Sequence, residues 1–160
     1  LAGAAEPVRA LLARNAAALL ARDPSLAAAR RDSLLASAVR SVDSASALDP
    51  WLRVYAAHDP AATARRVRVP VLVLHGETDG SVPVAQADAL AAAVRAGGNG
   101  RVTVRRFAAT NHLLVADPRG DPAGYDALPD ARVRPAVLGA LADWLVATLR
   151  AGAAGRVPPA

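Results

Sequence analysis

The stretch Val69-Pro70-Val71-Leu72-Val73-Leu74-His75-Gly76 decides the fold that this sequence predicts. Its valines and leucines follow one another without polar alternation, which is typical of a strand buried on both faces of a parallel sheet. Pro70 has no backbone N–H to give to a sheet, so the strand begins after it. Residues 84–96 then predict a helix that the glycines after it end, and residues 101–107 predict a second strand near a sheet edge.

The chain before this stretch predicts helices only. Helical spacing of apolar residues indicates one helix over residues 7–22 and another over residues 25–42, and residues 41–46 are expected to form a polar loop. Asp49-Pro50 opens a short helix that Asp59-Pro60 ends, and no strand is expected before residue 68.

The chain after the second strand predicts a loop and one closing helix over residues 134–150. The domain organisation follows from these elements. We expect a helical cap or lid segment over residues 1–60, an α/β core over residues 61–150 and a disordered tail over residues 151–160.

The composition limits the core. Of the 160 residues 53% are hydrophobic, but 42 are alanine, and isoleucine, methionine and cysteine are absent. The core therefore depends on valine and leucine. Two strands alone do not make a stable sheet covered on both faces. Because the sequence also does not begin with methionine, we expect this chain to be the C-terminal part of a longer fold.

Charge and residue usage argue against several classes of protein. The net charge is +5 and all 19 basic residues are arginine, but they are scattered and aromatic residues are few, so nucleic-acid binding is not expected. The longest apolar run, around Val71–Leu74, is far shorter than the ~20 residues of a membrane span. Without cysteine there is no disulfide or thiolate metal site, and the glycines of residues 97–100 follow a helix, unlike a phosphate-binding loop. No cofactor or metal is expected.

Reactive side chains follow both predicted strands where each strand ends. Asp79 comes after the first strand and His112 after the second, 33 residues later. Because parallel strands bring their carboxyl ends to one edge, which is where open α/β sheets bind ligands, we expect the two side chains to meet there. An aspartate that accepts the imidazole Nδ1–H leaves Nε2 to take a proton, so Asp79 and His112 are candidate catalytic residues.

These motifs resemble the C-terminal third of serine enzymes of the α/β-hydrolase superfamily, in particular esterase, dienelactone-hydrolase-like and prolyl-oligopeptidase-like members. The resemblance covers roughly residues 49–149, from Asp49-Pro50-Trp51 through His75-Gly76-Glu77-Thr78-Asp79 to Asn111-His112-Leu113-Leu114 and Tyr125. It implies that Asp79 is the acid after strand seven and His112 the base after strand eight. It implies a serine hydrolase that acts on small-molecule carboxylic esters, with peptides as the second choice.

The sequence departs from this family in lacking a nucleophile. No Gly-x-Ser-x-Gly occurs, and none of the seven serines (Ser25, Ser33, Ser37, Ser41, Ser44, Ser46 and Ser81) lies on a strand–turn–helix elbow. We therefore expect the nucleophile upstream of residue 1 and this chain alone to be inactive. The strand left without a neighbour is expected to favour association through its edge. The alternative is a non-catalytic α/β binding module or a degenerate hydrolase.

Other interpretations of the candidate residues stay open. Asp79 could be only a turn former, Glu77 could be the acid, and His112 could be structural. His75 at the strand end is interpreted as structural, and His58 as an exposed or capping residue. A metal site from His75, Asp79 and His112 has no close ligand spacing in its favour. Trp51 and Tyr55, four residues apart on one helical face, are candidates for core packing or for lining an acyl pocket.

Overall fold

The computed structural model describes residues 8–154 of the chain. The chain divides into two compact units, Leu1–Val67 and Arg68–Ala160. The described part of the first unit is helical, and the second unit carries a sheet with helices around it. The predicted α/β fold, with two parallel strands, flanking helices and a helical segment before them, is confirmed.

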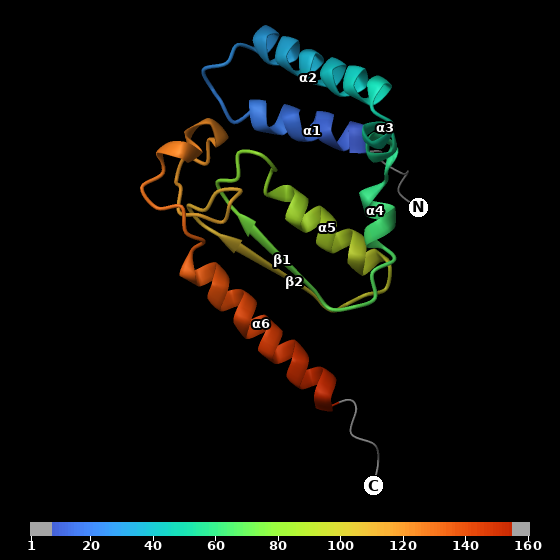
Figure 1. Cartoon of the computed structure of the whole chain (residues 1–160), viewed down its shortest axis with the longest axis vertical. Coiled ribbons are helices and arrows are strands. Elements are labelled where there is room, and N and C mark those ends of the chain that lie inside the picture. Colours follow the sequence, from blue (N-terminus) through green and yellow to red (C-terminus); the bar gives the residue numbers. More distant parts are fainter. Residues whose placement is uncertain (1–7, 155–160) are drawn as a thin grey trace. The chain divides into compact units, whose positions relative to one another are not determined.

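Four helices make up the first unit: α1 (Val8–Leu20), α2 (Ala28–Leu48), α3 (Pro50–Ala57) and α4 (Pro60–Ala64). Helices α1 and α2 lie side by side, and α3 contacts both (Figure 1). Two Asp-Pro pairs begin the short helices, because each aspartate caps the helix whose first residue is the proline. Asp49 accepts from the backbone N–H of Trp51, and Asp59 accepts from that of Ala62.

The polar loop expected over residues 41–46 is wrong, because α2 continues through it to Leu48. The Ser41 hydroxyl donates to the Ser37 carbonyl one turn earlier, so this side chain is hydrogen-bonded within the helix. The helix ends where the next residue must be extended. Asp49 precedes a proline, which disfavours helical dihedrals, and it has φ −114° and ψ 114°.

The second unit is built on two parallel strands, β1 (Val71–Gly76) and β2 (Val102–Phe107). They pair in register from Val71 opposite Val102 to Gly76 opposite Phe107. Helix α5 (Ala85–Ala96) connects them, as a parallel crossover requires. A short 3₁₀ helix, η1 (Pro122–Ala127), and the long helix α6 (Pro135–Ala154) follow β2. In agreement with the sequence, the described residues before residue 68 form no strand.

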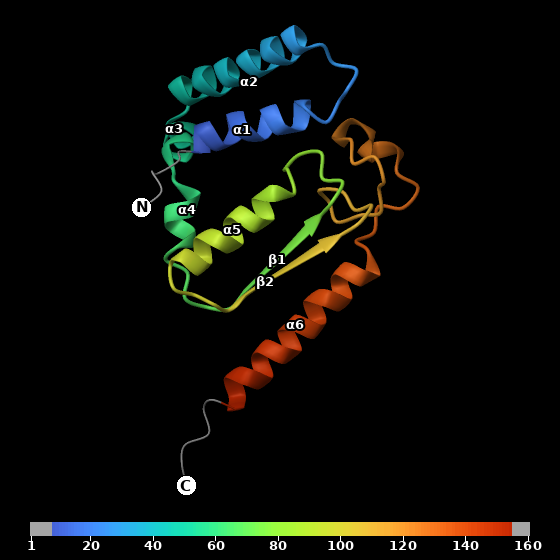
Figure 2. The same cartoon turned by 180° about the vertical axis from the view of Figure 1, so that it is seen from behind.

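Helices α5 and α6 lie on opposite faces of the two strands, as the front and back views show (Figures 1 and 2). The face toward α5 holds the core, which is small and built largely of alanine and valine; its buried members include Val73, Ala87, Ala91, Ala93 and Val94. Asn99, at the turn after α5, donates from its side chain to the Val69 carbonyl and accepts from the Arg101 N–H. This buried amide ties the crossover to the start of β1.

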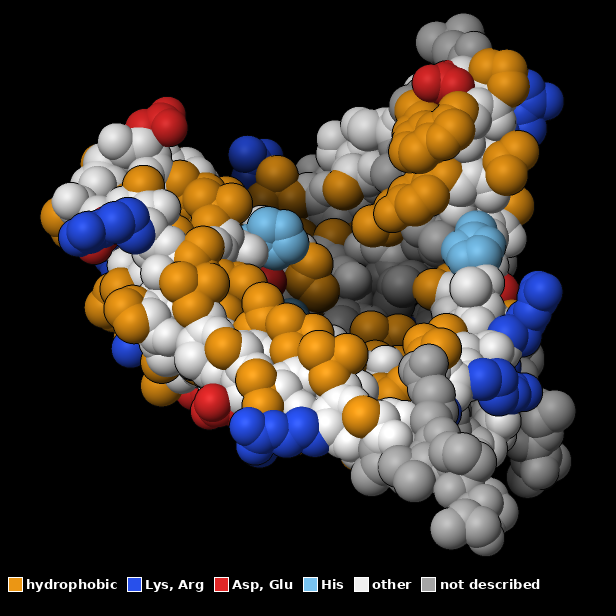
Figure 3. Space-filling model, turned by 60° about the horizontal axis from the view of Figure 1, so that its bottom comes forward, with side chains coloured by type: hydrophobic (Ala, Val, Ile, Leu, Met, Phe, Trp, Pro, Cys, Tyr) orange, Lys and Arg blue, Asp and Glu red, His pale blue; other side chains and the backbone are white. Residues whose placement is uncertain are grey.

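Helix α6 covers its face of the sheet only partly. A cavity of about 560 Å³ lies between the two, lined from the strands by Leu72, Thr103 and Arg105 and from α6 by Ala136, Gly139, Ala140, Asp143, Trp144 and Ala147. Leucines on other sides of the helix are exposed, and Figure 3 shows hydrophobic side chains gathered along α6. This helix therefore presents apolar surface that the described residues do not bury.

Helix α6 is longer than the sequence predicted, and it is apolar over most of its length. The tail predicted as disordered over residues 151–160 is wrong for its first four residues, since α6 continues to Ala154, and the rest lies outside the described residues. Among the described residues, one segment, Pro135–Ala153, is long and apolar enough to cross a membrane by length and composition alone. Polar and charged residues interrupt its apolar stripe.

Candidate active site

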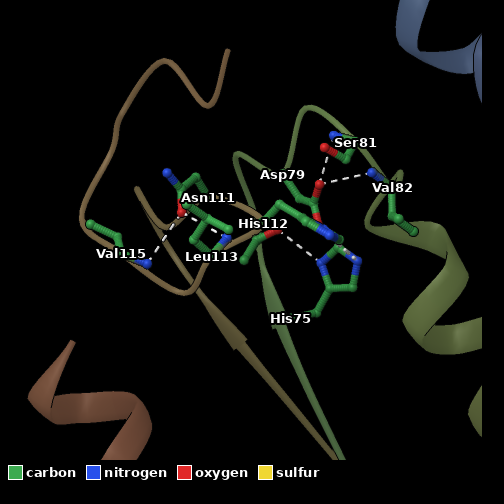
Figure 4. A network of polar contacts seen from close by, with 9 residues as sticks. His75, Asp79, Ser81, Val82, Asn111, His112, Leu113 and Val115 are labelled. Carbon is green, nitrogen blue, oxygen red and sulfur yellow. Dashed lines mark hydrogen bonds and ion pairs between the residues drawn. The ribbon is translucent and has the colours of Figure 1, made fainter. Parts of the chain in front are cut away.

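Asp79 and His112 meet at the carboxyl edge of the sheet. Nδ1 of His112 lies 2.9 Å from Oδ2 of Asp79 (Figure 4). A carboxylate oxygen only accepts, so Nδ1 donates and the ring's Nε2 is left for another partner. The Asp79 side chain is 6% exposed and that of His112 46% exposed. The acid is therefore shielded from water while the imidazole reaches the surface.

Asp79 also organises the turn that carries it. Its second oxygen, Oδ1, accepts from the backbone N–H groups of Ser81 at 2.7 Å and Val82 at 2.8 Å. Such a bond from an aspartate to the backbone two residues on is typical of an Asx turn. Asp79 thus forms this turn, and the same side chain also binds His112, one oxygen for each purpose.

A buried asparagine shapes the loop around His112. The side-chain oxygen of Asn111 accepts from the backbone N–H groups of Leu113 at 3.0 Å and Val115 at 3.2 Å. Its amide nitrogen donates to Oδ2 of Asp117 at 3.3 Å, and the residue is completely buried. Leu114 has a positive φ of 60°, which side chains rarely adopt. Asn111 thus holds a tight, strained turn, and His112 projects from it.

The loops that carry Asp79 and His112 are bonded to each other. The Thr78 hydroxyl donates to the Asp117 carbonyl at 2.6 Å, and the Thr78 N–H donates to the Thr110 carbonyl at 3.1 Å. Two glycines let the backbones approach this closely. A Cβ on Gly76 would lie 2.1 Å from the Thr110 carbonyl oxygen, and one on Gly120 would lie 1.5 Å from that of Thr78. The distance between Asp79 and His112 is therefore set by backbone contacts as well as by their own bond.

Asp117 is a buried carboxylate in the second of these loops. Hydrogen bonds lower its pKa, first that from the backbone N–H of Gly120, with those from the Asn111 amide and the Arg119 N–H adding to it and burial opposing them. Hydrogen bonds to the ionised form stabilise it. Asp117 is thus a fixed negative charge that anchors the loop after His112.

Sequence reasoning did not single out Asn111, Thr78, Asp117 and Gly120 as determinants of the site. The available signals were the asparagine directly before His112 and the Asp-Pro-x-Gly turn of residues 117–120. Both are common turn formers. Only their hydrogen-bond partners distinguish them from ordinary loop residues.

Glu77 and the other two histidines do not bond to His112. Glu77 is exposed, and its backbone N–H donates to the Phe107 carbonyl, so it continues the pairing of the strands while Asp79 binds His112. His75 is mostly buried beside Asp79, with its Nε2 3.8 Å from Oδ2 of Asp79. His58 ends α3 in the helical unit, where its Nε2 lies 3.1 Å from the Thr63 hydroxyl.

The structure shows no arrangement suited to a metal ion within residues 8–154, where no group of three or more His, Asp or Glu could hold one. His75, Asp79 and His112 do come together, but Nδ1 of His112 is engaged with the carboxylate. The observed contacts are those of a hydrogen-bonded acid–base pair.

Trp51 and Tyr55 lie in the helical unit, on α3. Their rings stack with centroids 5.3 Å apart and planes within 5° of parallel. Trp51 is 66% exposed and Tyr55 45% exposed, so core packing within this unit does not account for them. The structure thus brings these two residues together with each other, and Asp79 together with His112.

Comparison with known proteins gives one match. The family model described as the prolyl oligopeptidase family matches residues 38–129, which is more than half of the chain. The matched segment runs from α2 to just past η1 and includes both Asp79 and His112. No curated protein and no solved structure matches the chain.

Proposed function

This chain belongs to the prolyl oligopeptidase family, within the α/β-hydrolase superfamily, and from that premise we propose that it carries the acid and base of a serine hydrolase. The observation that supports this most is the bond of 2.9 Å between Nδ1 of His112 and the buried Asp79 carboxylate. It lies at the carboxyl edge of a parallel sheet, where α/β enzymes bind their substrates. We propose that the substrates are carboxylic esters.

In the proposed reaction, Nε2 of His112 takes the proton of a serine hydroxyl as that oxygen attacks the ester carbonyl. His112 then gives this proton to the leaving alcohol, and an acyl-serine remains. Water, activated by the same nitrogen, hydrolyses the acyl-serine. Asp79 holds His112 with Nδ1 protonated and stabilises the imidazolium that forms at each transfer.

The nucleophile and the oxyanion-hole donors are proposed to lie in polypeptide outside these 160 residues. None of the seven serines stands in a Gly-x-Ser-x-Gly sequence. Ser81, the serine nearest to Asp79 in the sequence, has its backbone N–H bonded to that carboxylate. The half-exposed ring of His112 is suited to receive a serine from another segment.

We further propose that the helices of the first unit act as a cap and that Trp51 and Tyr55 line the acyl pocket. Their stacked and exposed rings offer a flat apolar surface. Cleavage of peptide bonds is the second candidate, and the family match favours it. The same acid–base pair serves both reactions, since both pass through an acyl-serine.

The test is labelling of the protein that contains these residues together with its upstream sequence, using a fluorophosphonate probe that reacts with activated serines. We expect the unaltered protein to be labelled. His112→Ala should lower the labelling rate by roughly 10³-fold or more, because the serine loses its base. Asp79→Asn should also slow labelling strongly, because His112 then adopts the wrong tautomer.

His58→Ala is the matched control, because it removes a histidine from the helical unit. It should leave the labelling rate unchanged. Labelling that survives His112→Ala undiminished would contradict the proposed triad and favour a non-catalytic or degenerate hydrolase.

Two activity measurements address the substrate and the missing nucleophile. We expect the longer protein to hydrolyse p-nitrophenyl esters faster than peptide anilides, and Trp51→Ala to raise KM more for a long acyl chain than for acetate. Faster cleavage of the anilides would favour the peptidase instead. The 160-residue chain alone should show no burst of p-nitrophenyl acetate hydrolysis.

A further inference from the structure

His75 has one ring nitrogen fixed and the other without a partner. Its Nδ1 lies 2.8 Å from the Gly76 carbonyl oxygen, which can only accept, so Nδ1 donates. Its Nε2 is buried, and no polar atom of the described residues hydrogen-bonds to it. Buried polar atoms are nearly always hydrogen-bonded, so an unpartnered one needs an explanation.

The unpartnered nitrogen faces the carboxylate of the candidate triad. Nε2 of His75 lies 3.8 Å from Oδ2 of Asp79, the oxygen that accepts from His112 at 2.9 Å. Figure 4 shows both imidazole rings beside the Asp79 carboxylate. One buried oxygen thus has two imidazole nitrogens near it, one at hydrogen-bond distance and the other just beyond it.

We propose that His75 is a positioning residue that acts through Asp79 and controls how readily His112 takes up a proton. This inference rests on the proposed function of the pair. While His75 is neutral, its Nε2 carries no proton and Asp79 bonds to His112. When acid adds a proton from solvent to Nε2, the ring becomes a cation with an N–H toward Oδ2 and competes with His112 for that oxygen.

The two imidazoles are then coupled. A positive charge on either one opposes a positive charge on the other, because like charges that share a site disfavour each other. The general base needs His112 to become an imidazolium during the reaction. Protonation of His75 therefore works against catalysis, and deprotonation restores it.

The other charged groups around His75 do not replace this coupling. Arg106 is the cross-strand partner of His75, and its guanidinium forms an ion pair with Asp88 of α5, so that the two charges offset each other. Glu77, on the same loop as Asp79, is exposed to solvent. Nε2 of His75 lies within ion-pair distance of the Asp79 carboxylate, at 3.8 Å.

The first test is a pH titration by nuclear magnetic resonance of the 160-residue chain labelled with nitrogen-15. The chain has three histidines, so their ring nitrogens can be assigned by single substitutions. We expect His112→Asn to favour protonation of His75, since a nearby positive charge is removed. By reciprocity, His75→Asn should remove a step from the titration curve of His112.

His58→Asn is the matched control and should alter neither curve. Midpoints of His75 and His112 that do not respond to each other would overturn the proposal. A ring of His75 protonated at Nε2 and not at Nδ1 when neutral would also overturn it.

The second test uses the longer protein and the pH dependence of its fluorophosphonate labelling. His75→Asn keeps an amide donor for the Gly76 carbonyl but cannot titrate, whereas His75→Phe fills the space without a donor. We expect His75→Asn to make the loss of labelling at acidic pH less steep than in the unaltered protein.

A merely structural role predicts a different pattern, in which both variants slow labelling equally at every pH. That pattern, or an acid limb unchanged in His75→Asn, would overturn the proposal. If neither the variants nor the unaltered protein are labelled, this result counts against the proposed hydrolase. The coupling seen by magnetic resonance would stand independently of that result.

Discussion

At the scale of single residues, the site depends on polar side chains whose atoms each have a separate partner. Asp79 uses one oxygen for the turn and the other for His112. Asn111 similarly uses its oxygen for the backbone and its nitrogen for Asp117. Such divided bonding fixes a side chain from both ends, so its orientation is determined before any substrate arrives.

We predict that Asn111→Ala destabilises the protein by about 3 kcal/mol, because it leaves the buried N–H of Val115 and the N–H of Leu113 without their acceptor. The free energy of unfolding can be measured in urea. Asn99→Ala is the matched control, since Asn99 is another buried asparagine that bonds to backbone, at the other end of the sheet. Its loss should be similar, but only Asn111→Ala should alter the ring resonances of His112.

The lowered pKa of Asp117 predicts an acid-sensitive stability. Because its pKa is lower in the folded state, Asp117 contributes stability above its unfolded pKa of about 3.9, and this contribution is lost as the pH falls below that value. Asp117→Asn should cost about 2 kcal/mol at pH 7 and flatten the decline in acid. Unfolding in urea between pH 7 and pH 2 measures both effects.

Asp130→Asn is the control for this prediction. Asp130 also has a lowered pKa, due first to its hydrogen bond with the Arg132 side chain, but the pair is exposed. Exposed pairs contribute little to stability. A decline in acid that Asp130→Asn flattens as much as Asp117→Asn does would contradict the assignment to Asp117.

At the scale of elements, the site is made by two loops that interlock beyond the ends of β1 and β2. Each strand only delivers its loop to the same edge of the sheet. The Thr78 bonds and the close approach of Gly120 then fix one loop against the other. Loop positions that depend on backbone approach tolerate no added atoms at the point of contact.

We predict that Gly120→Ala costs about 3 kcal/mol or more and weakens the bond between Asp79 and His112. Gly120 has φ +67°, and a Cβ there would overlap the Thr78 carbonyl. Gly124→Ala is the control four residues later, where a Cβ meets nothing within 4 Å. Thermal unfolding of the two variants should differ accordingly, and equal melting temperatures would show that the loops do not interlock in solution.

At the scale of the whole chain, a small sheet and an apolar helix leave surfaces uncovered among the described residues. The sheet has two strands, and α6 exposes Leu138, Leu141, Leu145, Val146 and Leu149. Unpaired edges and exposed apolar patches both favour association. The expectation that the 160-residue chain associates through its sheet edge stays a prediction, and α6 offers a second surface for it.

Sedimentation velocity can distinguish the two surfaces. If α6 mediates association, replacing both Leu145 and Leu149 with glutamine should weaken it by about 100-fold, because each buried leucine contributes roughly 1.5 kcal/mol. Leu90→Gln, an exposed leucine on α5, is the control and should have little effect. Association unchanged in the double variant would favour the sheet edge.

The sequence by itself determined the parallel strands and the crossover helix, and it indicated Asp79 and His112 as candidates for the acid and base. The reason is that these depend on local patterns, namely an unbroken apolar run, helical spacing and the place of polar residues at strand ends. Where the local preference of the residues competes with packing, the prediction from sequence was wrong. Serines and an aspartate over residues 41–46 suggested a loop, but the helix continues through them.

Only the tertiary structure decided which atoms meet. The bond between Asp79 and His112 and the bonds of Thr78 to Thr110 and Asp117 join loops that follow different strands, so they arise from the relative position of two backbones. The bond of Asn111 to Asp117 and the placement of His75 against Asp79 join residues of one segment, and they depend on the conformation that the folded chain adopts there. The sequence thus indicates Asp79 and His112 as candidates, and the fold determines what surrounds them.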